Sequence, residues 1–205
     1  MLAAYGQSIH IYDYRTGEKL NECRIFHKNK VHTISICESG YVLLCGMKSV
    51  SIVKMNDLLY SSSVEENEKI VMECITSGEF SFDNDEVYLL TCYNEVIVVD
   101  LEGKVLLKKA IYGERSILYS GSIKVMSRDR VYINAGTVMG GVLIWDLFTA
   151  KEIHNLVGHA GSIFYVTLSD NGKYVASCSD DRSIRLWDFQ TGQELAVGWG
   201  HTARI

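Results

Sequence analysis

The sequence predicts an all-β fold built from a small repeated sheet. Two segments of the C-terminal half match each other closely: Val142–His159 reads VLIWDLFTAKEIHNLVGH and Ile184–His201 reads IRLWDFQTGQELAVGWGH. Their tryptophans, Trp145 and Trp187, lie 42 residues apart. Each copy holds short aliphatic runs separated by Gly, Asn, Asp and Thr, which is the pattern of strands joined by tight turns. No sustained apolar period of 3.6 residues, which a helical domain would need, is apparent.

The repeat extends over residues 1–205, which we treat as one domain. Fainter copies of the register place equivalent strand ends, at intervals of 41 to 46 residues, at Asp13, Lys54, Asp100, Asp146 and Asp188. The last copy contains four strand-like runs: Ser162–Leu168, Tyr174–Cys178, Ile184–Trp187 and Glu194–Val197. Four strands in about 40–45 residues are typical of one β-propeller blade, so we expect about four complete blades plus a partial one. A β-sandwich is the alternative, but it requires no fixed period.

The chain begins inside a blade, at its second strand, and ends just after a Gly-His pair. We therefore expect a fragment of a larger propeller. The alternative is a closed five-blade ring in which His201–Ile205 pairs beside Leu2–Tyr5. The segment Asn56–Lys69, with Ser61–Ser63 and several acidic residues, interrupts the period and predicts a long solvated loop with a regulatory or docking role as a further hypothesis.

Composition argues against several classes of protein. The net charge is −5 and no run of Lys and Arg occurs, so we expect weak intrinsic affinity for nucleic acid, tRNA included. Six cysteines without a CxxC pair predict reduced thiols in the cytoplasm, with the nucleus as the alternative, and no zinc site. The run Gly136–Gly141 lacks the Lys of a phosphate-binding loop, and neither an HExxH nor a dinucleotide motif occurs. No catalytic residue, metal site or cofactor is predicted.

The last copy carries the most specific motif. Gly158-His159, then SCSDD at Ser177–Asp181, then Leu186-Trp187-Asp188 resemble a WD40 repeat. The resemblance implies a WD40-type β-propeller. It also implies a hydrogen-bonded structural chain formed by four side chains: His159, Ser177, Asp181 and Trp187. Such a buried polar chain is favourable only when every member is satisfied.

The same residue types invite a catalytic-triad interpretation. A triad needs a serine oxygen exposed beside an oxyanion hole, whereas the repeat places Ser177 in the middle of a strand. The preceding copy has Ala135 and Met139 at the positions of the serine and aspartate. That copy resembles the family only in its strand pattern and its Trp-Asp pair.

A narrower resemblance rests on four segments in order: Gly136–Leu147, Gly158–Phe164, Ser177–Asp188 and the terminal GWGHTARI at Gly198–Ile205. Together they are similar to the N-terminal propeller of the WD-repeat subunit that partners a tRNA ribose 2′-O-methyltransferase. This resemblance implies a non-catalytic scaffold that binds the catalytic subunit and positions tRNA for methylation at the wobble nucleotide. It implies that tRNA is bound mainly through the complex. Apolar runs such as Val96–Val99 are far too short to span a bilayer, so we expect no membrane partner.

Three arginines are candidate partner contacts. Arg204 is the first, because a charged residue three positions after the motif His201 departs from the ordinary repeat; Arg182 and Arg185 are the others. A different WD adaptor, in ubiquitin ligation, trafficking or chromatin complexes, is the alternative function. An enzyme built on a propeller is the third hypothesis, and it would need converging ionisable groups that the sequence does not offer.

Overall fold

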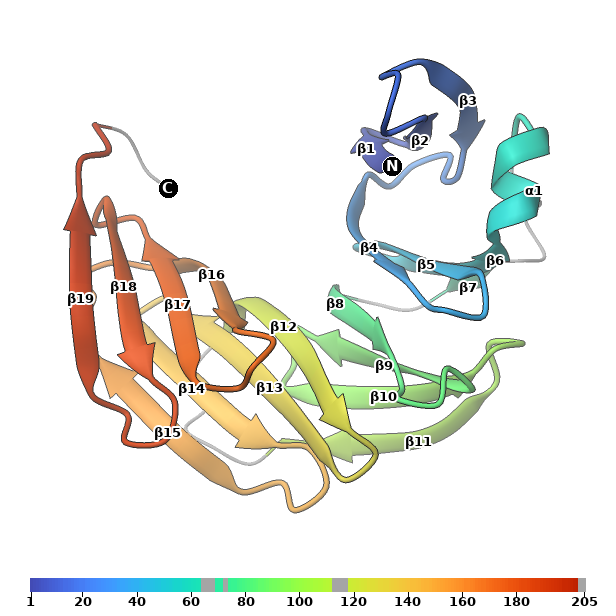
Figure 1. Cartoon of the computed structure of the whole chain (residues 1–205). Helices are drawn as coiled ribbons and strands as arrows, with labels where there is room; N and C mark the ends of the chain where they lie inside the picture. Colours follow the sequence, from blue (N-terminus) through green and yellow to red (C-terminus); the bar gives the residue numbers. More distant parts are fainter. Residues whose placement is uncertain (64–68, 72–73, 112–117, 203–205) are drawn as a thin grey trace. The chain divides into compact units, whose positions relative to one another are not determined.

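The computed structural model describes residues 1–63, 69–71, 74–111 and 118–202, which form β-strands and one short helix (Figure 1). The chain divides into two compact units. The first comprises Met1–Leu89 with Val98–Leu107, and the second comprises Leu90–Ile97 with the chain from Lys108 onward. In every sheet the strands follow one another in chain order, as in propeller blades.

The first unit starts with a three-stranded antiparallel sheet made of β1 (Leu2–Tyr5), β2 (Ser8–Tyr12) and β3 (Lys19–Arg24). A four-stranded antiparallel sheet follows, made of β4 (Val31–Ile36), β5 (Tyr41–Gly46), β6 (Ser49–Lys54) and β7 (Lys69–Val71), with α1 (Met55–Tyr60) between its last two strands. The next sheet has residues in both units and contains β8 (Ile75–Phe80), β9 (Glu86–Thr91), β10 (Glu95–Asp100) and β11 (Val105–Ala110).

The second unit contains two complete four-stranded antiparallel sheets. One consists of β12 (Leu118–Ser127), β13 (Arg130–Thr137), β14 (Gly141–Asp146) and β15 (Glu152–Val157). The other consists of β16 (Ile163–Leu168), β17 (Tyr174–Ser179), β18 (Ser183–Asp188) and β19 (Glu194–Trp199). Each predicted anchor residue stands at the end of the third-strand equivalent, as Asp13 does just after β2, so the all-β prediction is confirmed and the sheets are those of a partial β-propeller.

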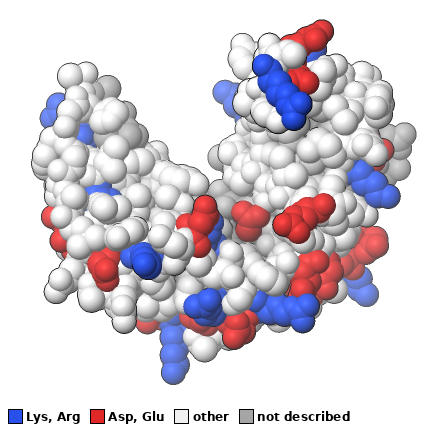
Figure 2. Space-filling view, viewed as in Figure 1, with Lys and Arg blue, Asp and Glu red and all other residues white. Residues whose placement is uncertain are grey.

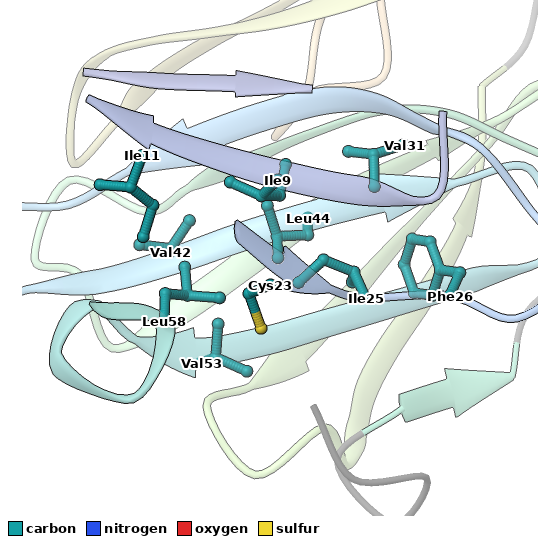
Figure 3. Packing of buried hydrophobic residues seen from close by; sticks show 10 residues of the cluster. All are labelled: Ile9, Ile11, Cys23, Ile25, Phe26, Val31, Val42, Leu44, Val53 and Leu58. Carbon is teal, nitrogen blue, oxygen red and sulfur yellow. The ribbon is translucent and has the colours of Figure 1, made fainter. Parts of the chain in front are cut away.

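The core of the first unit lies between its first two sheets. Ile9, Ile11 and Cys23 point from β2 and β3 toward Val42 and Leu44 of β5, and all five are buried (Figure 3). The cluster is completed by Ile25, Phe26, Val31, Val53 and Leu58. Burying aliphatic side chains of this size contributes about 1.5–3 kcal/mol each, so this contact is a major source of stability in the unit.

One expectation from the sequence is wrong. Part of the segment Asn56–Lys69 is helical rather than a solvated loop: α1 covers Met55–Tyr60 and buries Leu58 completely. The side-chain amide of Asn21 donates to the carbonyls of Leu58 and Ser61, at 2.7 and 2.9 Å, and so holds the end of the helix on β3. Residues 64–68 of the segment lie outside the described residues. So do residues 203–205, which belong to the pairing of His201–Ile205 with Leu2–Tyr5 in the alternative of a closed ring.

The sheets differ in how many of their faces are covered. All residues from Val87 to Thr91 and from Val96 to Val99 are buried, so β9 and β10 have apolar cover on both faces. The sheet β16–β19 instead alternates. One face packs on β12–β15 through Ile163, Val166 and Trp187, while the other leaves Tyr165 and Ile184 exposed. Side chains alternate between faces along a strand, so a strand covered on one side shows this period of two.

Gly136 of β13 marks the closest approach between the two sheets of the second unit. A Cβ at this position would lie 2.4 Å from Cβ and Cγ2 of Ile163 and 2.7 Å from Oγ of Ser120. We expect Gly136→Ala to lower the free energy of unfolding by about 1–3 kcal/mol, because the inserted methyl group must displace β16. Urea denaturation of the full chain measures this change.

Gly198→Ala is the matched control. Among the described residues, its Cβ would meet the carbonyl oxygen of Ile184 at 3.7 Å, which is an ordinary contact. We expect this variant to stay within about 0.5 kcal/mol of the parent. Equal losses from both variants would contradict close packing of β13 on β16.

Candidate functional site

The structure brings the four predicted side chains of the last repeat into one hydrogen-bonded chain. His159 lies in the connection between β15 and β16, Ser177 on β17, Asp181 in the turn after β17 and Trp187 on β18. His159 Nδ1 lies 2.9 Å from Asp181 Oδ2, and His159 Nε2 lies 2.9 Å from Ser177 Oγ. The indole Nε1 of Trp187 donates to the same Ser177 oxygen at 3.0 Å.

The hydrogen bonds of these four side chains run in one defined direction. A carboxylate only accepts, so Nδ1–H of His159 donates to Asp181 and Nε2 accepts the hydroxyl proton of Ser177. The Ser177 oxygen then accepts from the Trp187 indole. Every polar atom that links these four side chains is therefore hydrogen-bonded, which offsets the desolvation penalty of burying it.

Asp181 makes more contacts than the sequence indicated. Its Oδ2 accepts from the backbone N–H of Ala160 at 3.0 Å. Its Oδ1 accepts from the backbone N–H of Ser183 at 2.9 Å and from the Ser183 hydroxyl at 2.6 Å. Ser183 was not among the predicted residues, although an Asp side chain in a turn commonly accepts from the backbone N–H two residues on. Asp181 thus joins the β15–β16 connection to the β17–β18 turn.

The pKa values follow from these contacts. Burial acts to raise the pKa of Asp181, but the hydrogen bonds from Ser183, Ala160 and His159 outweigh it and hold that pKa well below its usual range. Burial lowers the pKa of His159, and the opposing attraction of Asp181 does not reverse that direction. At neutral pH the pair is a carboxylate and a neutral imidazole, which fits the direction of the chain.

The Asp181–His159–Ser177 order reproduces the connectivity of a catalytic triad without its accessibility. Ser177 is only 2% exposed, and its oxygen is already occupied by the imidazole and by the Trp187 indole. A nucleophile needs a free path to the carbonyl that it attacks. The geometry therefore indicates a role in stability.

The neighbouring sheet β12–β15 lacks the serine and the aspartate of this hydrogen-bonded chain. Ala135 of β13 is fully buried where β17 has Ser177, and Met139 is 84% exposed where the last repeat has Asp181. Trp145 of β14 is nevertheless fully buried, so it fills the same core position as Trp187. In the described part of β12–β15, Ala135 and Met139 therefore stand where the last repeat has the serine and the aspartate of the hydrogen-bonded chain.

The candidate partner contacts have different surroundings. Arg182 is exposed at the tip of the β17–β18 turn, with a left-handed backbone φ of 68°. Arg185 is half-buried, and its guanidinium forms an ion pair with Glu194 of β19. Its charge is therefore compensated within the sheet. Arg204 lies outside the described residues. Of the three, Arg182 is the one that the structure places in the open.

The described residues contain neither a cluster of metal ligands nor a membrane-spanning helix. Among them, no group of three or more His, Cys, Asp or Glu side chains is arranged to hold a metal ion. The helix described in this chain is too short to cross a membrane. The six cysteines form no disulfide, and cationic and anionic side chains are interspersed over the visible face (Figure 2).

Replacing Asp181 with alanine tests the hydrogen-bonded chain. The change leaves the His159 Nδ1–H and the two backbone N–H groups without their acceptor, and we expect a loss of about 1–3 kcal/mol in the free energy of unfolding. Asp170→Ala is the control, because Asp170 is a fully exposed carboxylate in the β16–β17 turn whose ion-pair partner among the described residues is Lys124. Thermal and urea unfolding of both variants measure this loss. An unchanged midpoint for Asp181→Ala would show that the hydrogen bonds of Asp181 do not stabilise the fold.

The pH dependence of stability tests the charge states. In the unfolded chain His159 titrates near 6.5, and its folded pKa is lower, so the unfolded state binds more protons below pH 6.5. We expect stability to fall as the pH drops below 6.5, and again below about 3.8, where unfolded Asp181 takes up a proton. His159→Gln removes the first component, so a slope between pH 7 and 5 equal to that of the parent would show that His159 is not held neutral.

Comparison with known proteins places this geometry in a family of repeats. Residues 150–188, which include all four members of the chain, match the family model described as WD domain, G-beta repeat. The WD repeat and SOCS box-containing protein 1 of Takifugu rubripes is 31% identical over 80 residues, which is 38% of this chain and 19% of that protein.

Two further relatives carry similar information. The WD repeat-containing protein 26 homolog of Arabidopsis thaliana is 27% identical over 161 residues, 77% of this chain and 26% of that protein. The striatin homolog of Dictyostelium discoideum is 28% identical over 111 residues, 50% of this chain and 13% of that protein. The chain thus spans between 13 and 26% of the length of these three relatives. It carries a WD repeat at residues 150–188 and is similar to WD-repeat proteins over most of its length.

Proposed function

We propose that this chain is the propeller segment of a non-catalytic scaffold that binds a catalytic subunit of a tRNA ribose 2′-O-methyltransferase. The coarser part of this statement, a WD-repeat protein-interaction scaffold, rests on the matched repeat and its relatives. The structural observation that supports a non-catalytic scaffold is that the potentially reactive side chains hydrogen-bond to one another. His159, Ser177 and Asp181 satisfy one another inside the sheet, so this site holds the fold and leaves recognition to the surface.

The identity of the partner rests on the resemblance alone. Four segments between Gly136 and Ile205 resemble, in their order, the WD-repeat subunit of the methyltransferase. The names of the relatives described above say nothing of tRNA methylation. In this function the partner supplies the methyl-donor site, and the scaffold supplies position. Holding two reactants in register lowers a barrier without any reacting group on the scaffold.

One end of the second unit has the properties of a partner-binding surface. Val138 and Met139 in the β13–β14 turn are exposed, as are Ala160 and Arg182 in the neighbouring loops. The Ser162 hydroxyl donates to the Val138 carbonyl at 3.0 Å, and Asp181 binds the Ala160 N–H, so the three loops are fixed together. A methionine and an arginine on a rigid surface are common anchors in protein interfaces.

Reconstitution tests the proposal. Full-length protein, a candidate methyltransferase and unmodified tRNA are combined, and methylation of the wobble ribose is measured. We expect the methyltransferase to be much more active with the scaffold than without it. Activity that is unchanged by the scaffold would contradict the function.

Charge reversal tests the surface. We expect Arg182→Glu to weaken co-purification of the methyltransferase while leaving the melting temperature unchanged, because Arg182 has no salt bridge among the described residues. Lys173→Glu is the control, since Lys173 is exposed in the turn at the other end of the same sheet and gives the same change in net charge. Equal weakening by both variants would contradict a contact at Arg182.

A general WD adaptor is the second candidate, favoured by relatives such as the WD repeat and SOCS box-containing protein 1. An affinity pull-down of the full-length protein separates the two. Recovery of a tRNA methyltransferase supports the first candidate, whereas recovery of another complex without it supports the adaptor.

A further inference from the structure

The first unit concentrates positive charge that the net charge of the chain hides. Residues 23–37 contain no Asp or Glu, but they contain Arg24, Lys28 and Lys30 together with His27 and His32. The chain as a whole carries a net charge of −5. Weak affinity for nucleic acid was expected from this net charge, but binding depends on the local arrangement of cations.

Backbone hydrogen bonds bring three loops together at this end of the unit. The N–H groups of Ile25 and Phe26 donate to the Gln7 carbonyl at 2.9 and 3.2 Å, and the Val31 N–H donates to the Gly6 carbonyl at 2.8 Å. The β3–β4 connection is therefore tied across the β1–β2 turn. It is tied to the β5–β6 turn as well, because the amide of Asn29 donates to the Ser49 hydroxyl at 3.1 Å.

This arrangement is rigid rather than a loose loop. The Phe26 side chain is 1% exposed and lies against Gly46, where an added Cβ would come within 3.0 Å of the ring. Buried Ile25 beside it joins the core of the unit. The cations of the connection are thus presented from a fixed backbone, which reduces the entropy lost on binding.

Four exposed cations surround these loops, and we call them the basic end: Arg24, Lys28, Lys30 and Lys48. None of them takes part in a salt bridge among the described residues. The guanidinium of Arg24 donates to the Gln7 side-chain oxygen at 2.9 Å, which orients it without neutralising it. The nearby Glu22 is paired with Lys19 at 2.5 Å, so its charge is largely compensated.

Beside the basic end lies an open hollow of about 630 Å³ lined by Tyr5, Gly6, Gln7, Ser8, Glu22, Arg24 and Lys30. The Tyr5 side chain is 76% exposed at its rim. Cations that neutralise phosphates, an aromatic ring that stacks on a base, and amide or hydroxyl groups that hydrogen-bond to it are the parts of a single-stranded RNA site.

We propose that the basic end binds the phosphodiester backbone of an unpaired RNA segment, with one base stacked on Tyr5. The inference rests on the proposed function for its setting, in which the RNA is tRNA held for the methyltransferase. An acidic peptide would use the same cations, but it has no base to place on the exposed ring. The binding is electrostatic and weakens with salt, so it is compatible with low affinity at physiological ionic strength.

Fluorescence anisotropy with labelled oligouridylate and the full chain at low salt tests the contact. If three or four phosphates are neutralised, the logarithm of the binding constant falls with the logarithm of salt concentration with a slope of about −2 to −3. We expect the double variant Lys28→Glu/Lys30→Glu to bind about tenfold more weakly or worse and to show a shallower slope.

The control is Lys54→Glu/Lys104→Glu, which changes the net charge equally at two exposed lysines. Both stand at the opposite ends of their sheets, Lys54 at the end of β6 and Lys104 in the β10–β11 turn. We expect this variant to retain most of the affinity and the salt slope. Equal losses in the two double variants would overturn the site, because they would show a response to net charge alone.

Tyr5 separates the two classes of ligand. We expect Tyr5→Ala to weaken oligouridylate binding about fivefold or more and Tyr5→Phe to restore it, since the ring and not the hydroxyl does the stacking. Poly-glutamate is the competing probe. If it binds as tightly as oligouridylate and is unaffected by Tyr5→Ala, the ligand is an acidic peptide and the proposal is overturned.

These tests can fail separately from the proposed function. Lys28→Glu/Lys30→Glu is introduced into the full-length protein, and co-purification of the methyltransferase is measured beside RNA binding. Loss of RNA binding with the methyltransferase retained supports an RNA contact distinct from the partner surface. Unchanged RNA binding overturns the basic end, whatever the methyltransferase does.

Discussion

The structure depends on one constraint: each sheet has at least one apolar face that must be covered, and the central sheet β8–β11 has two. Val87–Leu90 and Val96–Val99 are buried throughout their length, which a sheet with one face in water would not allow. Apolar burial drives folding in proportion to the area removed from water. A single sheet of this kind gains too little by itself, so the chain repeats it at intervals of 41 to 46 residues, and within each unit one copy packs on the next.

Turn chemistry explains how much of the fold could be predicted. In the last repeat the expected strand Tyr174–Cys178 is found as Tyr174–Ser179, and Glu194–Val197 as Glu194–Trp199, because Asn171-Gly172 and Thr191-Gly192 mark the turns clearly. The helix α1 was missed because it spans only six residues. Its signal is Met55, Leu58 and Leu59 at helical spacing, and it is too short to compete with the serines and acidic residues that follow.

Part of the candidate site could likewise be predicted from the sequence, and part could not. His159, Ser177, Asp181 and Trp187 could be placed from the motif, since the repeat fixes their spacing. The added contacts from Ser183 and the Ala160 N–H, and the pairing of Arg185 with Glu194, depend on which loops and strands come together. The basic end was missed for a related reason. Arg24, Lys28 and Lys30 are close in the sequence, but the total charge averages over them, and only the fold brings Lys48 of the β5–β6 turn to the same end of the unit.

The β15–β16 connection has a consequence for how the chain opens. On one side it is held by the β13–β14 turn, where Ser162 bonds to Val138 and the His159 carbonyl closes tightly over Gly140. On the other side Asp181 holds it to the β17–β18 turn. The connection therefore transmits cooperativity: β16–β19 cannot fray without releasing a segment that also clamps the preceding sheet. Amide hydrogen exchange in the two sheets of the second unit is accordingly governed by shared opening events, as in a linear array with nearest-neighbour coupling.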